Sequence, residues 1–428
     1  MESYRFMGIL NDVNEAVGVL EKYLSRMIAV EKIYVDEKLV GKYSARDVVA
    51  TGNIPPVNRA VVDGCAAMSI DIGGASPEAP VILKKKAIVY AGDKGGFKLD
   101  RGECVEVATG AVVPENSDVV IPAEYIVDIG GSKVSVIKEF NTGYGVSLKG
   151  EDLKQGELIV RKGDRLLEHH IAMMSALGIS EAEVWRLPRI AVFSTGDEVV
   201  EPGTAKSDGQ VFDSTRRLVK GFLTRIGFTD ILDYGIVPDN ADIIRKTLFE
   251  SLSKADLVVT IGGTSVGKRD TTIRTVEELD SKVMIHGFAL TPGRPAGLTV
   301  TSDEKIILSL SGMPVAALTE LLAILEPALA KSLGRSSRIL PVIKGVLKRR
   351  LVTHPGMLNY VRSRLTCGDD GRIYVEPLRL TGSGILSTLK EGPGIVVVPP
   401  HITGFNEGDI VDVILYDYQA LNCKGGVS

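Results

Sequence analysis

A glycine-rich segment with a charged end offers the clearest chemistry in this sequence. Residues 256–270 read Asp-Leu-Val-Val-Thr-Ile-Gly-Gly-Thr-Ser-Val-Gly-Lys-Arg-Asp, so an apolar run of strand type ends in three glycines within six residues. Glycines there let the backbone approach a ligand closely and direct N–H groups toward it, which suits phosphate. The segment therefore predicts a phosphorylated ligand. The alternative is a glycine-rich turn that only links a strand to a helix.

The same segment comes close to a nucleotide-binding P-loop. Gly262 to Lys268 fits G-x-x-x-x-G-K, but Arg269 stands where the motif needs Ser or Thr to place a hydroxyl on Mg²⁺. This departure argues against a P-loop nucleotidase. Asp270 could hold Mg²⁺ instead.

Four other polar loops carry groups that suit the same ligand. They lie at 195–198, 238–240, 291–295 and 311–314. Their side chains include carboxylates for Mg²⁺ and a guanidinium for an anion, at Asp197, Glu198, Asp239 and Arg294. Carboxylates and phosphate repel each other unless a cation bridges them, so this set predicts a divalent metal.

Strand and helix patterns alternate from Pro188 onward and would position these loops. Apolar runs typical of buried strands occupy 190–194, 231–237, 257–261, 283–286, 297–301 and 306–310. Helical patterns occupy 214–226, 240–253, 271–279 and 315–333, with Asp213 or Ser214 and Asp239 or Asn240 as caps of the first two. The alternation predicts an α/β domain with a parallel, doubly wound sheet. If all its strands run parallel, the five loops lie at the carboxyl edge, where ligands of such sheets bind.

The chain of 428 residues is too long for one core, and its remaining segments predict further domains. An amphipathic helix covers 9–30, short β runs fill 45–146, a helical pattern returns around Leu166–Leu177, and β runs fill 341–418. We therefore predict four domains. They are a helical and β domain (1–44 and 147–186), an inserted β domain (45–146), the α/β domain (187–335), and a C-terminal β-barrel or sandwich (336–428).

Composition excludes several classes of function. The formal charge is −4 with both signs interspersed, so no nucleic-acid surface is expected. No apolar run approaches about 18 residues, so no membrane span is expected. Four widely separated cysteines (Cys65, Cys104, Cys367 and Cys423) argue against a zinc ribbon or a disulfide framework and indicate a cytoplasmic protein. Five histidines, none at H-x-x-x-H spacing, leave catalysis to carboxylates, backbone and cations.

Ordered motifs over the whole chain resemble the molybdopterin molybdenumtransferases, the MoeA and gephyrin E-domain family. The motifs that carry the resemblance are Val62–Ala66, Ala108–Pro114, Gly150–Leu153, Pro188–Glu198, Gly262–Gly267 with Asp270, and Pro292–Pro295. The resemblance implies a multidomain fold with a molybdopterin-binding-like α/β domain, an inserted β domain, an elongated piece and a C-terminal β-barrel. It also implies a homodimer with the active site in a cleft between the subunits.

The reaction implied by the resemblance joins adenylylated molybdopterin and molybdate (or tungstate) to give molybdenum cofactor, AMP and water, with Mg²⁺. Such a reaction needs no protein nucleophile, so positioning and electrostatics carry it. Phosphate would be cradled by the glycine loop, and the oxyanion pocket would be shaped by the 292–295 loop. The residues are Gly262, Gly263, Ser265 and Gly267 for the first, and Pro292, Arg294 and Pro295 for the second, with Ser214 as a further binding residue.

The resemblance assigns roles to carboxylates as well. Asp270 and Asp239 would hold Mg²⁺ with Glu198 nearby, and Asp63 would reach in from the inserted domain, from its own or the other subunit, to assist hydrolysis. Without the resemblance, Asp63-Gly64 is a simple turn, and Glu198 is a first-turn carboxylate that favours a helix dipole.

The sequence departs from the family pattern near the oxyanion. Thr291 replaces a lysine and Ala316 replaces a serine, while Met313, Thr215 and Cys65 differ from the family's asparagine, asparagine and tyrosine. Losing a cation and a donor would weaken molybdate binding, by about 1–3 kcal/mol each if the groups are buried. The alternative function is therefore a diverged, non-catalytic paralogue that binds molybdopterin or its adenylylated form.

Overall fold

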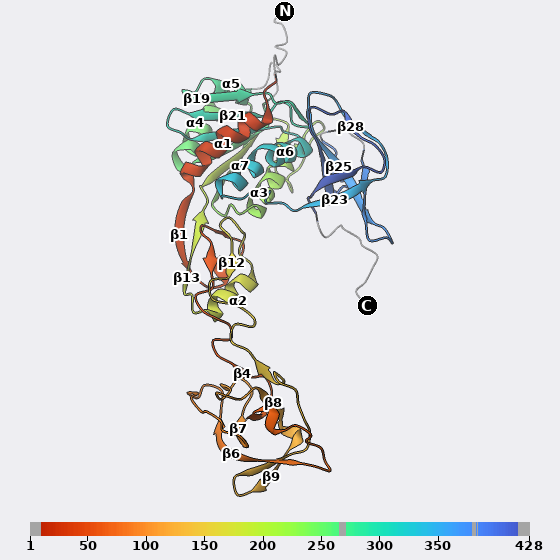
Figure 1. Ribbon diagram of the computed structural model, residues 1–428. Helices are drawn as coiled ribbons and strands as arrows, with labels where there is room; N and C mark the ends of the chain where they lie inside the picture. Colours follow the sequence, from red (N-terminus) through yellow and green to blue (C-terminus); the bar gives the residue numbers. More distant parts are fainter. Residues whose placement is uncertain (1–9, 265–270, 379–381, 383, 418–428) are drawn as a thin grey trace, which may run out of the picture.

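A computed structural model of the chain describes residues 10–264, 271–378, 382 and 384–417. The molecule is elongated (Figure 1): an α/β body and a β-barrel lie side by side at one end, a narrow arm leads away from them, and a second β domain forms the far end. No helix among the described residues is long and apolar enough to cross a membrane.

The α/β body is built on a six-stranded sheet with the order β17-β14-β18-β22-β21-β19. Its strands are β14 Ile190–Thr195, β17 Ile231–Val237, β18 Leu257–Ile261, β19 Ser281–His286, β21 Gly297–Thr301 and β22 Ile306–Leu310. The strands β17, β14, β18 and β22 run parallel, as predicted. A small pair, β15 Val199–Val200 and β16 Val211–Phe212, follows β14.

One strand breaks the predicted parallel order. β21 is antiparallel to both β22 and β19. Only residues 302–305 join β21 to β22, and a connection this short permits a hairpin but no crossover. Because β19 is antiparallel to β21, it runs with the other strands, so the five polar loops still lie at one edge.

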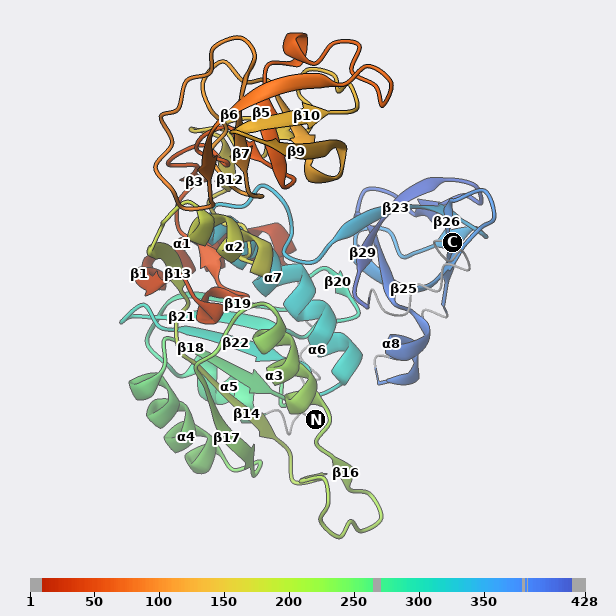
Figure 2. The ribbon, with the colours of Figure 1, turned by 90° about the horizontal axis from the view of Figure 1, so that it is seen from below.

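Helices cover both faces of this sheet, which confirms the doubly wound arrangement. On one face, α1 Val13–Met27, α3 Thr215–Arg225 and the helices α6 Pro314–Glu320 and α7 Glu326–Ser332 bury residues such as Val192. On the other, α4 Ala241–Lys254 and α5 Thr271–Glu277 bury Phe193, its neighbour on β14. Figure 2 shows α3 and α6 on the opposite side of the strands from α4. Successive residues of a strand point to opposite faces, so the continuous apolar runs supply both cores.

The single helix predicted over 315–333 is interrupted. A π-helical turn, η4 Leu321–Leu325, separates α6 from α7. Pro327 follows at the start of α7, where it lacks an N–H and its ring would collide with the carbonyl four residues earlier. This accounts for the irregular turn just before it.

The arm is a three-stranded sheet with the order β1-β13-β2. It consists of β1 Ala29–Tyr34, β13 Glu181–Arg186 and β2 Tyr43–Ser44, flanked by η1 Glu37–Leu39, α2 Glu168–Ala176 and the pair β3 Val48–Val49 and β12 Leu158–Val160. Tyr43 fixes the arm to the α/β body because its hydroxyl donates to Ile226 O at 3.0 Å. Its ring also fills the space that a Cβ on Gly227 would need, at 2.7 Å.

The domain at the far end is a six-stranded sheet with the order β8-β5-β7-β6-β10-β9. Its strands are β5 Gly64–Ala67, β6 Val81–Val89, β7 Glu103–Val107, β8 Val119–Pro122, β9 Ile126–Gly130 and β10 Lys133–Val136, with the short helices η2 Ser69–Asp71 and η3 Ala123–Tyr125. The chain enters through β4 Arg59–Ala60 and leaves through β11 Val146–Ser147, which pair with each other. The predicted β insertion is therefore present.

The C-terminal region is a closed five-stranded barrel, so the prediction of a barrel or a sandwich resolves to the barrel. β25 Leu358–Cys367, β26 Ile373–Pro377, β23 Val342–Leu347, β29 Ile410–Leu415 and β27 Gly394–Val398 follow one another, and β25 pairs with β27 to close the ring. Around it lie the short pair β24 Leu351–Val352 and β28 Gly404–Phe405, and α8 Ser387–Glu391. Cys367 is disulfide-bonded, which the cysteine spacing did not predict.

Candidate active site

The glycine-rich segment begins at the carboxyl end of the central strand β18, as the sequence predicts. Gly262 has φ +93° and Gly263 has φ +62°, a region that residues with a side chain rarely adopt. A Cβ on Gly262 would lie 2.7 Å from the Thr195 carbonyl oxygen, and one on Gly263 would lie 2.5 Å from Thr272 Oγ1. Both positions therefore require glycine, because a side chain would clash with its neighbours and would disfavour the backbone conformation.

The N–H of Gly262 already has a partner, since it donates to Leu310 O at 2.9 Å within the sheet. A phosphate at this loop would therefore be bound by the amides that follow, from residue 263 onward. The predicted site residues Ser265, Gly267 and Asp270 lie outside the described residues.

Hydroxyl groups tie three further segments to this edge. Thr195 Oγ1 at the end of β14 lies 2.9 Å from Thr272 Oγ1 on α5, and both residues are buried. Thr215 Oγ1 at the start of α3 donates to Gly312 O at 2.7 Å. A Cβ on Gly312 would lie 3.5 Å from Gly262 Cα. The loops after β14, β18 and β22 therefore meet, as the carboxyl-edge rule predicts.

Ser214, a predicted binding residue, is half-buried at the N-cap of α3 beside these contacts. Its side chain forms no capping hydrogen bond. Asp213 caps instead, because its Oδ1 accepts from the Arg216 N–H at 3.0 Å. The Ser214 hydroxyl is therefore not needed by the helix.

Two of the predicted carboxylates lie in neighbouring loops of the same edge. The Asp239 N–H donates to Asp197 Oδ1 at 3.0 Å, which joins the loop after β17 to the loop after β14. Glu198 is exposed, and both of its carboxylate oxygens lie 3.0 Å from the position of a Cβ on Gly196, so the side chain folds back over that glycine.

These carboxylates suit Mg²⁺ only if the substrate supplies some of its ligands. Among the described residues no group of three or more His, Cys, Asp or Glu side chains is arranged to hold a metal ion. Mg²⁺ is commonly bound by one or two protein carboxylates, with water and substrate phosphates completing its shell. Asp197 and Asp239, beside a glycine-rich loop, match that description.

The loop predicted to shape the oxyanion pocket joins β20 Leu290–Thr291 to β21 and lies against α6. Arg294 is exposed, whereas Pro292 and Pro295 are half-buried. Gly293 between them has φ +118°, and a Cβ there would lie 2.7 Å from Glu320 Cγ. The loop is therefore held on Glu320.

Glu320 itself was missed from the sequence. It is fully buried; its Oε2 accepts from the Ser311 N–H at 2.8 Å, and its Oε1 and the Ser311 hydroxyl are joined by a second hydrogen bond. Burial raises the pKa of Glu320 to about 8, although the two hydrogen bonds from Ser311 oppose this. The residue thus joins the loops at 291–295 and 311–314. A carboxyl residue in the apolar stretch Val315–Leu325 was the available signal.

Arg362 on β25 was also missed. It is 5% exposed, burial holds the pKa of its guanidinium below the usual value, and its Nε has no hydrogen-bond partner among the described residues. Tyr360, on the same face of the strand, donates to Leu322 O at 3.4 Å, so this face of the barrel meets the α/β body. Burying a guanidinium nitrogen without an acceptor costs free energy.

A third missed residue supports the glycine loop. His286 Nε2 at the end of β19 lies 2.8 Å from Thr264 O, and Asn11 Nδ2 donates to His286 O at 2.9 Å. The single histidine at a strand end carried no recognisable signal.

Asp63 lies apart from all of these residues. It precedes β5 in the domain at the far end of the arm, away from the sheet edge of the same chain (Figure 1). It is exposed, and its Oδ1 accepts from Thr109 N at 2.6 Å and from Thr109 Oγ1 at 2.8 Å. These bonds, the backbone one foremost, hold the pKa of Asp63 below its usual value. A carboxylate kept ionised in this way is a weak base but can stabilise positive charge.

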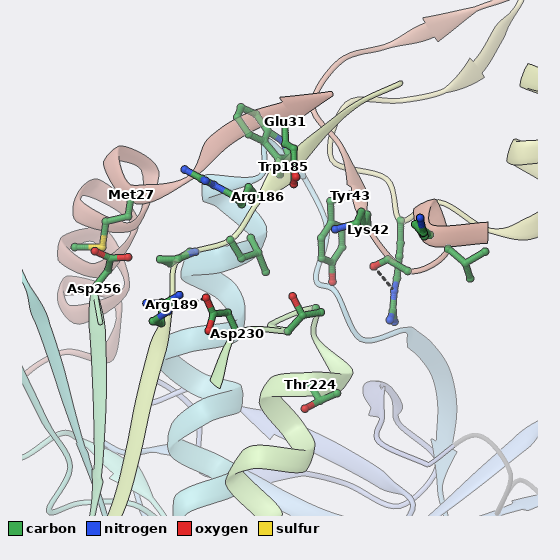
Figure 3. Close-up of a pocket in the computed structure, with 18 of the residues that line it drawn as sticks. Met27, Glu31, Lys42, Tyr43, Trp185, Arg186, Arg189, Thr224, Asp230 and Asp256 are labelled. Atoms are coloured by element: carbon green, nitrogen blue, oxygen red, sulfur yellow. Dashed lines mark hydrogen bonds and ion pairs between the residues drawn. The ribbon is translucent and has the colours of Figure 1, made fainter. Parts of the chain in front are cut away.

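A cavity of about 620 Å³ opens at the opposite edge of the sheet (Figure 3). Arg189, Asp230 and Asp256, which precede β14, β17 and β18, line it together with Tyr43 and Trp185 of the arm. None of the predicted site residues that the structure describes borders it. Because ligands of such sheets bind at the carboxyl ends, this cavity is separate from the candidate active site.

Three family models match the chain in order. They are described as the MoeA N-terminal region (domain I and II) at residues 11–178, a probable molybdopterin binding domain at 191–331, and the MoeA C-terminal region (domain IV) at 344–416.

Individual relatives and structures match over almost the full length. A Methanocaldococcus jannaschii protein, provisionally named a molybdopterin biosynthesis protein, is 31% identical over 92% of this chain and 94% of its own. A molybdopterin molybdenumtransferase of Staphylococcus epidermidis is 27% identical over 94% of this chain and 95% of its own. A crystal structure of a MoeA protein from Pyrococcus horikoshii, 30% identical, has a TM-score of 0.76 over 96% of this chain and 100% of its own.

An α/β domain with glycine-rich and acidic loops at its carboxyl edge, an inserted β domain and a C-terminal barrel thus occur together, in the order that the relatives share. The chain belongs to the MoeA family of molybdopterin biosynthesis proteins.

Proposed function

We propose that this protein is a molybdopterin molybdenumtransferase, which inserts molybdate or tungstate into adenylylated molybdopterin and releases AMP. The observation that carries the proposal is the convergence of the loops after β14, β17, β18, β19 and β22 at one edge of the sheet, in a chain that matches the family along nearly its whole length. The names of relatives at 27% identity support the same activity.

In this proposal the phosphates of the substrate lie on the glycine loop. Gly262 and Gly263 contribute close approach of the backbone, and the amides of Gly263, Ser265 and Gly267 bind phosphate. Asp239 and Asp270, with Asp197 and Glu198 beside them, hold Mg²⁺, which would neutralise phosphate charge when bound.

The oxyanion lies between the α/β body and the barrel. Arg294 and Arg362 would supply positive charge, and Pro292 and Pro295 would shape the pocket. Thr291 stands where the family pattern has a lysine, and Arg362 would supply the positive charge that this replacement removes. A buried guanidinium binds an oxyanion strongly. A sulfur of Met313 lies 3.9 Å from a Cβ on Gly384, so the barrel reaches the loop after β22.

Asp63 would complete the site from a second copy of the chain. Its distance from the sheet edge within one chain, together with its ionised state, supports a homodimer in which the far domain of one subunit faces the α/β body of the other. We further propose a cytoplasmic location and the four domains bounded at residues 44/45, 146/147, 186/187 and 335/336.

The test is a single-turnover assay with purified protein, adenylylated molybdopterin, Mg²⁺ and either molybdate or tungstate, in which AMP release is measured. We expect release that depends on the oxyanion and is lost in Asp63→Ala and Asp239→Ala. Exposed Asp242 lies near Asp239 in sequence, so Asp242→Ala is the matched control and should keep activity. Tight binding of the substrate without release under either oxyanion would reject the enzyme.

A further inference from the structure

The buried carboxyl of Glu320 is a group that the proposed chemistry leaves without a role. It lies beneath two of the loops at the candidate site, in contact with Ser311 on one side and Gly293 on the other. A carboxyl is rarely buried without a cation to pair with it, so its surroundings decide which state it holds.

Within the part of the chain that the structure describes, Glu320 has Ser311 as its polar partner and no cation. The elements packed on α6 are η4, α3, β20 and β22, and the loop at 291–295 lies against it. The charged side chains on these elements or next to them are Arg216, Arg217, Lys220 and Arg225 on α3, Asp213 before α3, Lys305 before β22, Arg294 on the loop, and Glu326 after η4. Lys305 pairs with Asp256 at 3.0 Å.

These charged groups are satisfied or exposed elsewhere. Arg216, Arg217 and Lys220 bind the carboxylates of Glu201, Asp213 and Asp233, and Glu326 binds Arg338. Arg225 lies over the ring of Tyr416, and Arg294 is exposed. No ion pair between any of them and Glu320 is present among the described residues, so burial dominates and favours the neutral acid.

Two states of the carboxyl give two orientations of the Ser311 hydroxyl. An ionised Glu320 is an acceptor only and takes the hydrogen of Ser311 Oγ. A neutral Glu320 donates its own O–H to Ser311 Oγ, which frees the serine hydrogen for another acceptor. The Ser311 N–H donates to Oε2 in both states, so the position of the loop does not depend on the proton.

We infer that Glu320 is a positioning residue that acts as a protonation-dependent regulator of oxyanion binding at this site. In its neutral form it joins the two loops without placing a charge beneath them. Loss of its proton to solvent puts a negative charge under the pocket and withdraws the Ser311 hydrogen, and both effects disfavour a bound dianion. The inference rests on the proposed function, since it names the regulation of the same site.

The test measures affinity and stability across pH on the full chain. Calorimetric titration with molybdate should show that Kd of the wild-type protein rises about tenfold between about pH 7 and about pH 9. In Glu320→Gln, whose amide imitates the neutral acid, Kd should stay within about twofold over this range. Glu277→Gln, an exposed carboxylate on α5, is the control and should keep the wild-type profile.

Thermal unfolding provides a readout that does not depend on the ligand. Because burial raises the pKa of Glu320 to about 8, the folded protein holds a proton that the unfolded chain has already lost above the ordinary value of 4.5. The free energy of unfolding contributed by Glu320 therefore falls as pH rises from about 5 to about 8, and it changes no further above that pH. The midpoint of the wild-type protein should fall relative to that of Glu320→Gln over this interval.

Each result decides the matter. A pH-independent difference in midpoint, or a Glu320→Gln protein whose Kd still rises toward about pH 9, would overturn the inference. Absence of molybdate and tungstate binding at every pH would overturn it together with the proposed function. In that event the midpoints would still report whether Glu320 titrates, so the two failures are distinguishable.

Discussion

Gly263 stands where a methyl group has no room. With φ +62° and a Cβ that would lie 2.5 Å from Thr272 Oγ1, Gly263→Ala should cost about 1–3 kcal/mol of stability and displace the amides offered to phosphate. Thermal unfolding and substrate binding measure the two effects. Gly312→Ala is the matched control, because its Cβ would make an ordinary contact at 3.5 Å. It should change stability by no more than about 0.5 kcal/mol.

Arg362 is the buried guanidinium that the proposed function places beside the oxyanion. Arg362→Gln should weaken molybdate binding by about tenfold or more, because a charge-assisted contact is lost. Stability should be unchanged or rise by about 1 kcal/mol, because an unpaired buried charge is removed. Calorimetric titration and thermal unfolding test this pair of effects.

The control for that change lies on the same strand. Arg364 is exposed and pairs with Glu376 and Glu391 at 3.2 and 3.4 Å, so Arg364→Gln should leave molybdate affinity as it is. Equal losses in the two variants would argue that the barrel, rather than the guanidinium of Arg362, had been disturbed.

Single residues could be predicted where their position in the chain fixes their position in space. Asp197 and Asp239 follow β14 and β17, and the carboxyl edge of the sheet brings their loops into contact. Glu320 and Arg362 could not be found in this way, since their importance comes from burial between segments distant in sequence. A helical or strand pattern tells which residues share a face but not what covers it.

At the scale of elements, the start of α4 holds the loop that carries Asp239. Asn240 caps this helix, because its Oδ1 accepts from the Asp242 N–H at 3.0 Å and from the Ile243 N–H at 3.1 Å. Asn240→Ala should cost about 1 kcal/mol and loosen the preceding carboxylate, which would raise the Mg²⁺ concentration needed for AMP release. Thermal unfolding and an Mg²⁺ titration measure this.

Ser214→Ala offers the comparison, because that residue occupies an N-cap without a side-chain capping bond. Its cost should stay below about 0.5 kcal/mol. A loss as large as that of Asn240→Ala would mean that the cap of α4 contributes nothing specific.

The strands of the α/β body were predictable because each is an apolar run bounded by turn residues. Four of them, β17, β18, β21 and β22, have the predicted bounds. The predicted direction of β21 was wrong, because the periodicity of a strand carries no information on its direction. The four-residue link between β21 and β22 does carry that information, since so short a link requires a hairpin. The amphipathic pattern of α1 likewise predicted an apolar face but could not name α7 as a partner of that face.

At the scale of the whole molecule, the separation of Asp63 from the sheet edge predicts that two inactive variants can restore each other. Mixing Asp63→Ala with Asp239→Ala after subunit exchange should recover about a quarter of wild-type AMP release. Half of the dimers would be mixed, and each mixed dimer would hold one intact site of two. The measurement is AMP release before and after exchange.

A mixture that stays as inactive as its parents would place Asp63 and Asp239 in the same subunit's site or reject the dimer. Sedimentation of the mixture separates these cases. The control is a mixture of Asp239→Ala with Gly263→Ala, because both residues belong to the α/β body. In its mixed dimers each α/β body carries one of the two changes, so no site is intact and AMP release should not recover.

The joint between the arm and the α/β body has a mechanical consequence. Tyr43 packs on Gly227 and donates a hydrogen bond to Ile226 O, so this contact lies at the base of the arm whose far domain carries Asp63. A small rotation of the arm about this contact would displace the carboxylate by much more, because displacement grows with distance from the axis of rotation. Under the proposed function, the alignment of the reacting groups is therefore set in part by a joint that touches no ligand.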